Sequence, residues 1–176
     1  GDISLRFLRG GGGEACITDI NHAMLAAGRG RRDLQRLAHR LSWCVANAES
    51  LPFDDHSADF VTIAFGLRNV TDRQAALNEA YRILKPGGRF LCLEFSHVQS
   101  RPLAKLYDSF SFNILPVMGQ VIAGDADSYR YLAESIRTFP SKEMLADMFA
   151  EAGFAQIRVR SLSAGIACIH SGWKLD

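Results

Sequence analysis

One apolar run constrains the fold of this chain more than any other stretch. Residues 60–65, FVTIAF, are too short for a helix and rich in β-branched and aromatic side chains, so they predict a buried central strand. Gly66 follows at once and frees the backbone just before Arg68 and Asn69. In an open α/β sheet a ligand lies beyond the carboxyl ends of the strands. We therefore expect the chemistry between Ala64 and Asn69.

Other apolar runs alternate with helical patterns on either side of this strand. The predicted strands cover residues 15–18, 42–46, 60–65, 89–95, 156–162 and 165–170. The predicted helices cover residues 3–8, one apolar stripe from 21 to 41, then 72–84, 132–137 and 141–152. Strands that alternate with helices at this spacing predict a parallel sheet with crossover helices. The short connection between the last two strands predicts an antiparallel hairpin.

The bulk properties favour an ordinary globular domain and argue against several classes of protein. A chain of 176 residues can bury its own core, and 48% hydrophobic with 22% charged residues is a typical balance. The net charge of +1 argues against a nucleic-acid surface, and we interpret the basic cluster at 29–40 as a solvated helix face. The four cysteines lie far apart, which predicts no metal site. Three of them lie in or beside apolar runs, where a reduced thiol packs as a small apolar group.

Polar residues at the ends of two predicted strands point to an adenosyl cofactor. Asp19 closes one strand, about 20 residues after Gly1, which stands in what resembles a glycine turn. In that pattern the carboxylate accepts from both ribose hydroxyls, although an aspartate there also caps a following helix. Asn47 and Ala48, at the next strand end, either cap a turn or hold the adenine edge. A nicotinamide dinucleotide and S-adenosylmethionine both fit, and a parallel sheet that ends in a hairpin favours the second.

Several long motifs then follow one another in a fixed order. They are FGLRNVT at 65–71, RILKPGGRFLCLEFS at 82–96, DSYRYLAESI at 127–136, and GI at 165–166 with HSG at 170–172. Together they resemble the ubiquinone/menaquinone biosynthesis C-methyltransferase family over essentially the whole chain. The resemblance implies an α/β fold of the class I S-adenosylmethionine-dependent methyltransferases, a Rossmann-like sheet with a carboxyl-terminal antiparallel hairpin.

The resemblance also implies an activity and roles for particular residues. The reaction would be C-methylation of 2-methoxy-6-polyprenyl-1,4-benzoquinol in ubiquinone synthesis, and of demethylmenaquinol in organisms that make menaquinone. Asp19 would bind the ribose, and Asn47 and Ala48 would contact the adenine side. Ala64 stands where many members have a serine at a cofactor contact, so a side-chain hydrogen bond is lost there.

The front of the chain departs from the family pattern. Family members carry an amino-terminal helical region and a first strand that ends in Gly-Thr-Gly-Asp, of which Gly1 and Asp2 match the last two residues. We therefore expect the first strand of the sheet and half of the cofactor turn to be missing from residues 1–176. On this expectation these residues alone fold poorly and bind little cofactor, and tight stoichiometric binding by calorimetry would refute it.

Arg68 and Asn69 are the candidate catalytic residues. Methyl transfer to carbon needs an electron-rich ring, which a hydroquinone supplies as a hydroxyl loses its proton; a guanidinium would stabilise the developing oxyanion and an amide would orient it. Arginine is a poor base, so water or a neighbouring side chain would take the proton, with His97 and His170 as further candidates. The competing interpretation is that Arg68 pairs with Asp54 or Asp125 and only locks the loop.

The remaining expectations concern organisation and partners. We expect residues 1–176 to form a single methyltransferase domain, with an insertion at about 100–137 that forms part of the substrate pocket; residues 103–124 read either as a core helix pair or as the wall of an apolar pocket. The expected partners are a polyprenyl quinol, a quinone-biosynthesis complex and a second copy in a homodimer, with peripheral membrane contact. The location would be the cytoplasmic side of a bacterial inner membrane or the mitochondrial matrix side. The competing functions are methylation of another small molecule and a non-catalytic scaffold.

Overall fold

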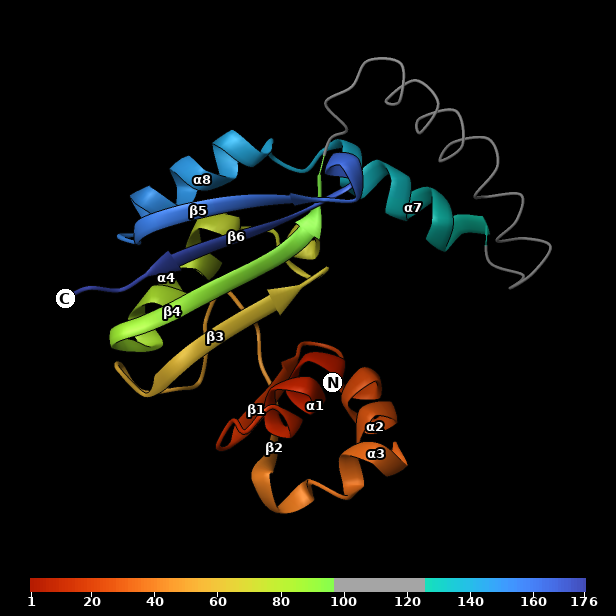
Figure 1. The fold of residues 1–176 in the computed structure, drawn as a ribbon. Coiled ribbons are helices and arrows are strands. Elements are labelled where there is room, and N and C mark those ends of the chain that lie inside the picture. Colours follow the sequence, from red (N-terminus) through yellow and green to blue (C-terminus); the bar gives the residue numbers. More distant parts are fainter. Residues whose placement is uncertain (97–125) are drawn as a thin grey trace. The chain divides into compact units, whose positions relative to one another are not determined.

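The structure is a computed structural model that describes residues 1–96 and 126–176, and the side chains of residues 130–176 in the second range (Figure 1). Its contacts divide the chain into two compact units, Gly1–Pro52 and Phe53–Asp176, which we describe separately. Most of the predicted insertion at 100–137, including residues 103–124, lies outside the described residues. The organisation of residues 1–176 as one domain stays a prediction.

The first unit is a pair of parallel strands covered by short helices. Its elements are α1 (Asp2–Arg9), β1 (Ala15–Asp19), α2 (His22–Arg29), α3 (Arg32–Gln35), η1 (Ala38–Arg40) and β2 (Leu41–Val45). The strands pair in register from Ala15 opposite Leu41 to Asp19 opposite Val45, so their carboxyl ends share one edge. Leucines form the small core: Leu5, Leu8, Leu25 and Leu34 are buried.

The prediction of one helical stripe from residue 21 to residue 41 is wrong. Asn21 does cap α2, because its side chain accepts from the Ala23 amide, but the helix ends at Arg29 and Gly30. Gly28 lies so close to Trp43 that a Cβ there would come 2.7 Å from the ring. The apolar residues that continue the stripe belong to other elements, so the basic cluster at 29–40 does not form one helix face.

The second unit is a four-stranded mixed sheet with helices packed on it (Figure 1). Its elements are β3 (Ala58–Ala64), η2 (Leu67–Asn69), α4 (Arg73–Ile83), β4 (Leu84–Phe95), α7 (Ala126–Arg137), α8 (Lys142–Glu151), β5 (Ala155–Leu162), η4 (Ser163–Gly165) and β6 (Ala167–Trp173). The strand order is β3-β4-β6-β5, with β3 and β4 parallel and β6 antiparallel to both of its neighbours. The predicted carboxyl-terminal hairpin is thus confirmed.

Aromatic rings fill the core between this sheet and its helices. Phe90 of β4 stacks on Phe149 of α8 at a centroid distance of 5.2 Å and on Phe154 at 5.4 Å. Leu77 and Leu145 are also fully enclosed. Among the helices that the structure describes, none combines the length and the apolar character needed to cross a bilayer.

Two predictions of burial are wrong. Residues 60–65 were expected to form a buried central strand, yet β3 lies at the edge of the described four-stranded sheet, and Phe60 and Phe65 are 40% and 38% exposed. The strand at 15–18 was expected to be buried, but Cys16 is exposed. The common reason is that β3 pairs only with β4, and β1 only with β2, among the described strands.

Candidate active site

The parallel pairing in the first unit brings the predicted cofactor residues to one edge. Asp19 ends β1, and its carbonyl accepts from the Ala46 amide at 3.1 Å, directly before Asn47. The Asp19 carboxylate accepts from the Asn21 amide at 2.8 Å, and the Asn47 side chain accepts from the Glu49 amide at 3.1 Å. Both side chains thus have one local partner. A carboxylate has about four lone-pair positions, so Asp19 retains acceptor capacity for the hydroxyls of a ligand.

Two exposed apolar side chains beside Asp19 were not predicted as site residues. Ile20 follows the carboxylate and is 70% exposed, and Val45, opposite Asp19 on β2, is 51% exposed. Apolar surface of this extent next to a carboxylate suits the flat face of a purine. The sequence signal was the apolar residue placed immediately after a strand-ending aspartate. Ile20 and Val45 thus add exposed apolar surface at the strand ends that carry Asp19 and Asn47.

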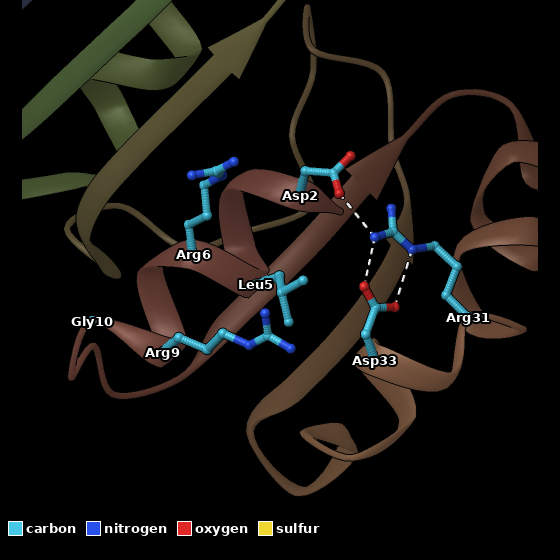
Figure 2. Close-up of a pocket in the computed structure, with 7 residues that line it drawn as sticks. All are labelled: Asp2, Leu5, Arg6, Arg9, Gly10, Arg31 and Asp33. Carbon is cyan, nitrogen blue, oxygen red and sulfur yellow. Dashed lines mark hydrogen bonds and ion pairs between the residues drawn. The ribbon is translucent and has the colours of Figure 1, made fainter.

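The first unit also contains a hollow of about 550 Å³, which is lined mainly by charged side chains (Figure 2). Its lining residues are Asp2, Leu5, Arg6, Arg9, Gly10, Arg31 and Asp33. Arg31 lies 2.8 Å from the Asp2 carboxylate and 2.7 Å from that of Asp33. Hydrogen bonds from Arg31 lower the pKa of both carboxyls, and those of Asp33 and Asp2 raise the pKa of Arg31. None of the predicted site residues lines this hollow.

In the second unit the carboxyl end of β3 is strained. Ala64 pairs with Leu93 of β4, and the next residue, Phe65, has a positive φ of 53°. A side chain in the left-handed region costs of order 1–3 kcal/mol and persists only where the surroundings impose it. Here the Phe65 amide donates to the Leu93 carbonyl at 2.8 Å, and its ring lies 4.6 Å from that of Phe95. Strain of this kind concentrates at functional sites.

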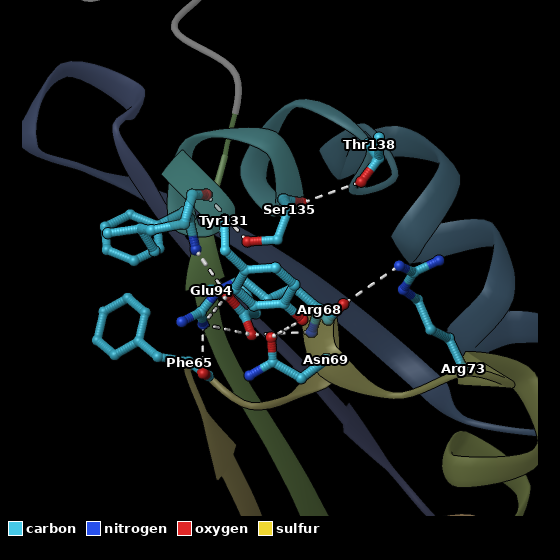
Figure 3. A network of polar contacts seen from close by, with 10 residues as sticks. Phe65, Arg68, Asn69, Arg73, Glu94, Tyr131, Ser135 and Thr138 are labelled. Atoms are coloured by element: carbon cyan, nitrogen blue, oxygen red, sulfur yellow. Dashed lines mark hydrogen bonds and ion pairs between the residues drawn. The ribbon is translucent and has the colours of Figure 1, made fainter. Parts of the chain in front are cut away.

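A buried ion pair fixes the turn that follows. Glu94 of β4 is 1% exposed, and its carboxylate lies 3.2 Å from the Arg68 guanidinium (Figure 3). It also accepts from the backbone amides of Arg68 and Phe95, each at 3.1 Å. The guanidinium donates to the Phe65 carbonyl as well and lies 5.5 Å from the centre of the Phe95 ring. Glu94 therefore joins the end of β4 to η2, the segment that carries both candidate catalytic residues.

The second candidate, Asn69, is exposed and held from another helix. The Tyr131 hydroxyl of α7 donates to the Asn69 side-chain oxygen at 3.0 Å (Figure 3). Behind it, the Arg73 guanidinium donates to the Arg68 carbonyl at 3.3 Å. The turn after β3 thus presents a guanidinium and an amide side by side, with hydrogen-bond partners from β4, α4 and α7.

The structure changes the list of partners and of possible bases. The acid paired with Arg68 is Glu94 rather than Asp54, and Asp125 lies outside the described residues. His170, one of the further candidates for a base, is buried, and its ring lies 2.8 Å from the Lys142 carbonyl, which favours a structural role. Desolvation in this core lowers the pKa of His170 below its ordinary value. The other candidate base, His97, lies outside the described residues.

Comparison with known sequences decides the family. A family model described as the ubiE/COQ5 methyltransferase family matches residues 1–174. The chain belongs to this family. Proteins from Cereibacter sphaeroides and Acidiphilium cryptum, both named ubiquinone/menaquinone biosynthesis C-methyltransferase UbiE, are 54% and 55% identical over 99% of the chain and 70% of their own length. The chain is thus of the UbiE type, a quinone-biosynthesis C-methyltransferase family whose cofactor is S-adenosylmethionine.

Solved structures agree on the fold. A Thermotoga maritima protein described as an S-adenosylmethionine-dependent methyltransferase aligns over 96% of this chain and 75% of its own, with a TM-score of 0.65 at 22% identity. A putative methyltransferase from Bacillus halodurans aligns over 99% and 88%, with a TM-score of 0.68 at 14% identity. The [4+2]-cyclase SpnF aligns over 97% and 69%, with a TM-score of 0.70 at 16% identity. At these identities the likeness establishes the class I methyltransferase fold alone.

Proposed function

We propose that this protein transfers a methyl group from S-adenosylmethionine to a ring carbon of 2-methoxy-6-polyprenyl-1,4-benzoquinol. The observation that carries the proposal is the pair of donors at the end of β3. Arg68 and Asn69 stand together on a turn held by buried Glu94, at the strand end where an open α/β sheet places its ligand. The names of the relatives, which refer to ubiquinone and menaquinone biosynthesis, support the quinol as acceptor.

The first unit would bind the cofactor. The Asp19 carboxylate would accept from the ribose hydroxyls, with Asn47 and Ala48 at the adenine edge and exposed Ile20 against its face. Ala64, in the second unit, has no hydroxyl to contribute. S-adenosylmethionine, when bound, supplies an electrophilic methyl group on a sulfonium.

The second unit would prepare the acceptor. As a ring hydroxyl of the quinol loses its proton, negative charge develops on its oxygen, and the Arg68 guanidinium and the Asn69 amide would stabilise it. The ring carbon would then form a bond to the methyl group with a pair of ring electrons. The electrons of the broken methyl–sulfur bond would stay on sulfur, and the methylated ring carbon would later lose its proton. Arg68 stays protonated throughout, so water or another side chain takes the hydroxyl proton. The rings of Phe65 and Phe95 give this turn an apolar surface.

A methyl-transfer assay tests the proposal. The protein encoded by the complete gene, S-adenosylmethionine with a deuterated methyl group and a chemically reduced short-tail demethyl quinol are incubated together, and the product is followed by mass spectrometry and NMR. We expect a deuterated methyl on a ring carbon. Label on another small molecule would point to a different acceptor of the same fold, and no transfer to any quinol would point to the scaffold.

Arg68→Lys is the matched variant for the acceptor side. Lysine keeps the positive charge but replaces the guanidinium, whose Nη1 bonds both Glu94 and the Phe65 carbonyl, by a compact ammonium on a flexible stem. We expect cofactor affinity to stay within about twofold and kcat to fall sharply, by roughly 10²–10³ as when an oxyanion donor is removed. Unchanged turnover would remove Arg68 from the mechanism.

A polyprenyl acceptor implies contact with a membrane surface. A long prenyl tail partitions into a bilayer, and we propose that the protein collects its acceptor there as a peripheral protein. Binding to vesicles that carry the quinol, compared with vesicles that lack it, checks this proposal by sedimentation.

A further inference from the structure

Tyr131 is more exposed than the other tyrosines and phenylalanines whose side chains the structure describes in the second unit. Tyr131 is 55% exposed, so less than half of its surface is covered by packing. Its hydroxyl donates a hydrogen bond to the Asn69 side-chain oxygen at 3.0 Å. Figure 3 shows the ring reaching from α7 across to the turn that carries Arg68 and Asn69. Burial of the ring in the core therefore does not account for the position of Tyr131 beside the candidate catalytic amide.

The direction of this hydrogen bond determines what Asn69 can offer. An asparagine amide has one oxygen that accepts and one nitrogen that donates two protons. When the oxygen accepts from Tyr131, the nitrogen faces away from the tyrosine, and the side chain of Asn69 is exposed there. Asn69 is then oriented as a donor, which is the role that a developing oxyanion requires.

The guanidinium of Arg68, the neighbouring donor, is also fixed by hydrogen bonds. The Arg68 guanidinium bonds the Glu94 carboxylate and the Phe65 carbonyl through Nη1. Two adjacent donors are therefore each held by a partner on a different element, Arg68 by β4 and Asn69 by α7. Donors that are already oriented need no reorganisation when charge develops, which is why such preorganisation accelerates a reaction.

We propose that Tyr131 is a positioning residue for methyl transfer: its hydroxyl holds the Asn69 amide with the nitrogen directed to the acceptor oxygen. The proposal rests on the proposed function, because it needs an oxyanion at this turn. It makes α7 part of the active-site machinery, although Tyr131 touches neither the cofactor nor the reacting atoms.

The test is Tyr131→Phe, which removes the hydroxyl and keeps the ring. We expect kcat to fall about tenfold, less than the ~10²–10³ for loss of an oxyanion donor itself, while KM for S-adenosylmethionine stays unchanged. Tyr81→Phe is the matched control, because the Tyr81 hydroxyl makes a bond of the same kind, to Asp176 at 2.8 Å, on another helix. The control should keep wild-type kcat. Equal losses in both variants, or no loss in Tyr131→Phe, would overturn the proposal.

A double variant separates positioning from a general structural role. If Tyr131 acts through Asn69, Tyr131→Phe should cost nothing further in an Asn69→Ala background. A full additional tenfold loss would overturn the proposal. A second readout needs no turnover: the side-chain amide signals of Asn69 in a ¹⁵N NMR spectrum should shift and broaden in Tyr131→Phe and stay unchanged in Tyr81→Phe.

The outcomes also distinguish this proposal from the proposed function. If the wild-type protein methylates no quinol, the proposed function fails, and an unchanged Asn69 signal in Tyr131→Phe would then sink the positioning role as well. If the wild type methylates the quinol and Tyr131→Phe is equally fast, the proposed function stands and only the role of Tyr131 fails.

Discussion

The two strand ends that carry the candidate site differ in how their polar groups are held. At the paired ends of β1 and β2, Asp19 and Asn47 each accept one backbone amide within two residues along the chain. At the end of β3, Arg68 and buried Glu94 form an ion pair across 26 residues of sequence, with two further backbone amides bonded to the same carboxylate. The first end is capped locally, with Asn47 exposed and Asp19 half-buried, and the second is a network around the buried Glu94.

The two strand ends suit two different functions, cofactor binding and stabilisation of charge in the transition state. A cofactor binds and leaves in every cycle, so its ribose contacts are best made by groups with few other partners, such as the half-buried Asp19, whose carboxylate accepts from the Asn21 amide. A developing charge in a transition state is stabilised best by donors fixed in advance, as Arg68 and Asn69 are. The comparison predicts that substitutions at the β3 end lower stability and kcat, whereas those at the β1 end lower cofactor affinity alone.

The largest expected effect is Arg68→Met. Glu94 would then keep a buried charge without its partner, and removal of one member of a buried ion pair costs about 3–5 kcal/mol. Urea unfolding monitored by circular dichroism measures the loss. The double variant Arg68→Met/Glu94→Gln should recover more than half of it, because the uncompensated charge is gone.

Arg31→Met provides the matched control for that experiment. Arg31 also pairs with carboxylates, Asp2 and Asp33, but its side chain is 37% exposed. Exposed ion pairs contribute little to stability because solvent screens them, so this variant should lose far less than Arg68→Met. An equal loss in the two single variants would mean that burial does not distinguish the two regions.

The next effect concerns Asp19→Asn. The charge on the acceptor is removed, and a hydrogen bond to a charged group contributes about 1.5–3 kcal/mol, so we expect the Kd for S-adenosylmethionine to rise roughly 10- to 150-fold. Stability should change little, since asparagine still accepts from the Asn21 amide. Isothermal titration calorimetry measures the affinity.

Asp72→Asn is the control for Asp19→Asn. Asp72 also accepts a backbone amide, that of Ala75 at 3.0 Å, at the start of α4 in the second unit. It should leave the Kd unchanged, and a comparable rise there would assign the effect at Asp19 to the overall charge of the protein.

A smaller effect is the pH dependence of the second unit. Burial lowers the pKa of His170, with Glu143 and Lys142 as its charged neighbours, whereas the unfolded chain keeps a pKa near 6.5. As the pH falls below about 6.5, the unfolded state takes up a proton that the folded state does not, so stability falls. Urea midpoints at pH 7.5 and 5.5 should differ less in His170→Gln than in the wild type. An undiminished difference would assign the acid sensitivity to other groups.

The smallest expected effect concerns the solvent exposure of the four cysteine thiols. Cys16 is exposed and Cys44 is half-buried, whereas Cys92 and Cys168 are 0% and 1% exposed, and burial raises the pKa of the Cys92 thiol. Only thiolates react quickly with a disulfide reagent. We expect the first-unit thiols to react first and Cys92 and Cys168 only after denaturation. Four equally fast thiols would contradict the contrast between the two units.

Local patterns in the sequence predicted much of the fold. The strand that ends at Asp19, the cap at Asn21 and the closing hairpin all follow from alternation, capping and turn chemistry within a few residues. The end of α2 at Arg29 and Gly30 was missed because the apolar stripe continues past it. The close approach of Trp43 to Gly28 is a tertiary contact that the local sequence does not encode. The edge position of β3 likewise depends on strand order, which periodicity does not encode.

The candidate site divides in the same way. Arg68 and Asn69 were predicted from their place after a strand, because that inference needs only the local sequence. Glu94 was missed as the partner of Arg68 because their contact depends on the register of β3 and β4, with Ala64 opposite Leu93. The available signal was a carboxylate inside an otherwise apolar strand, which needs a buried partner. Tyr131 was missed because it comes from a distant helix.

The central claim is that the donors at the end of β3 serve carbon methylation of a quinol. The most direct measurement is the product formed from S-adenosylmethionine with a ¹³C-labelled methyl group and a demethyl benzoquinol, observed by NMR for the wild type and for Arg68→Lys. The account predicts a ring-carbon methyl signal that grows much more slowly in the variant, at equal cofactor affinity. A labelled methyl on oxygen, or equal rates in the two proteins, would contradict it.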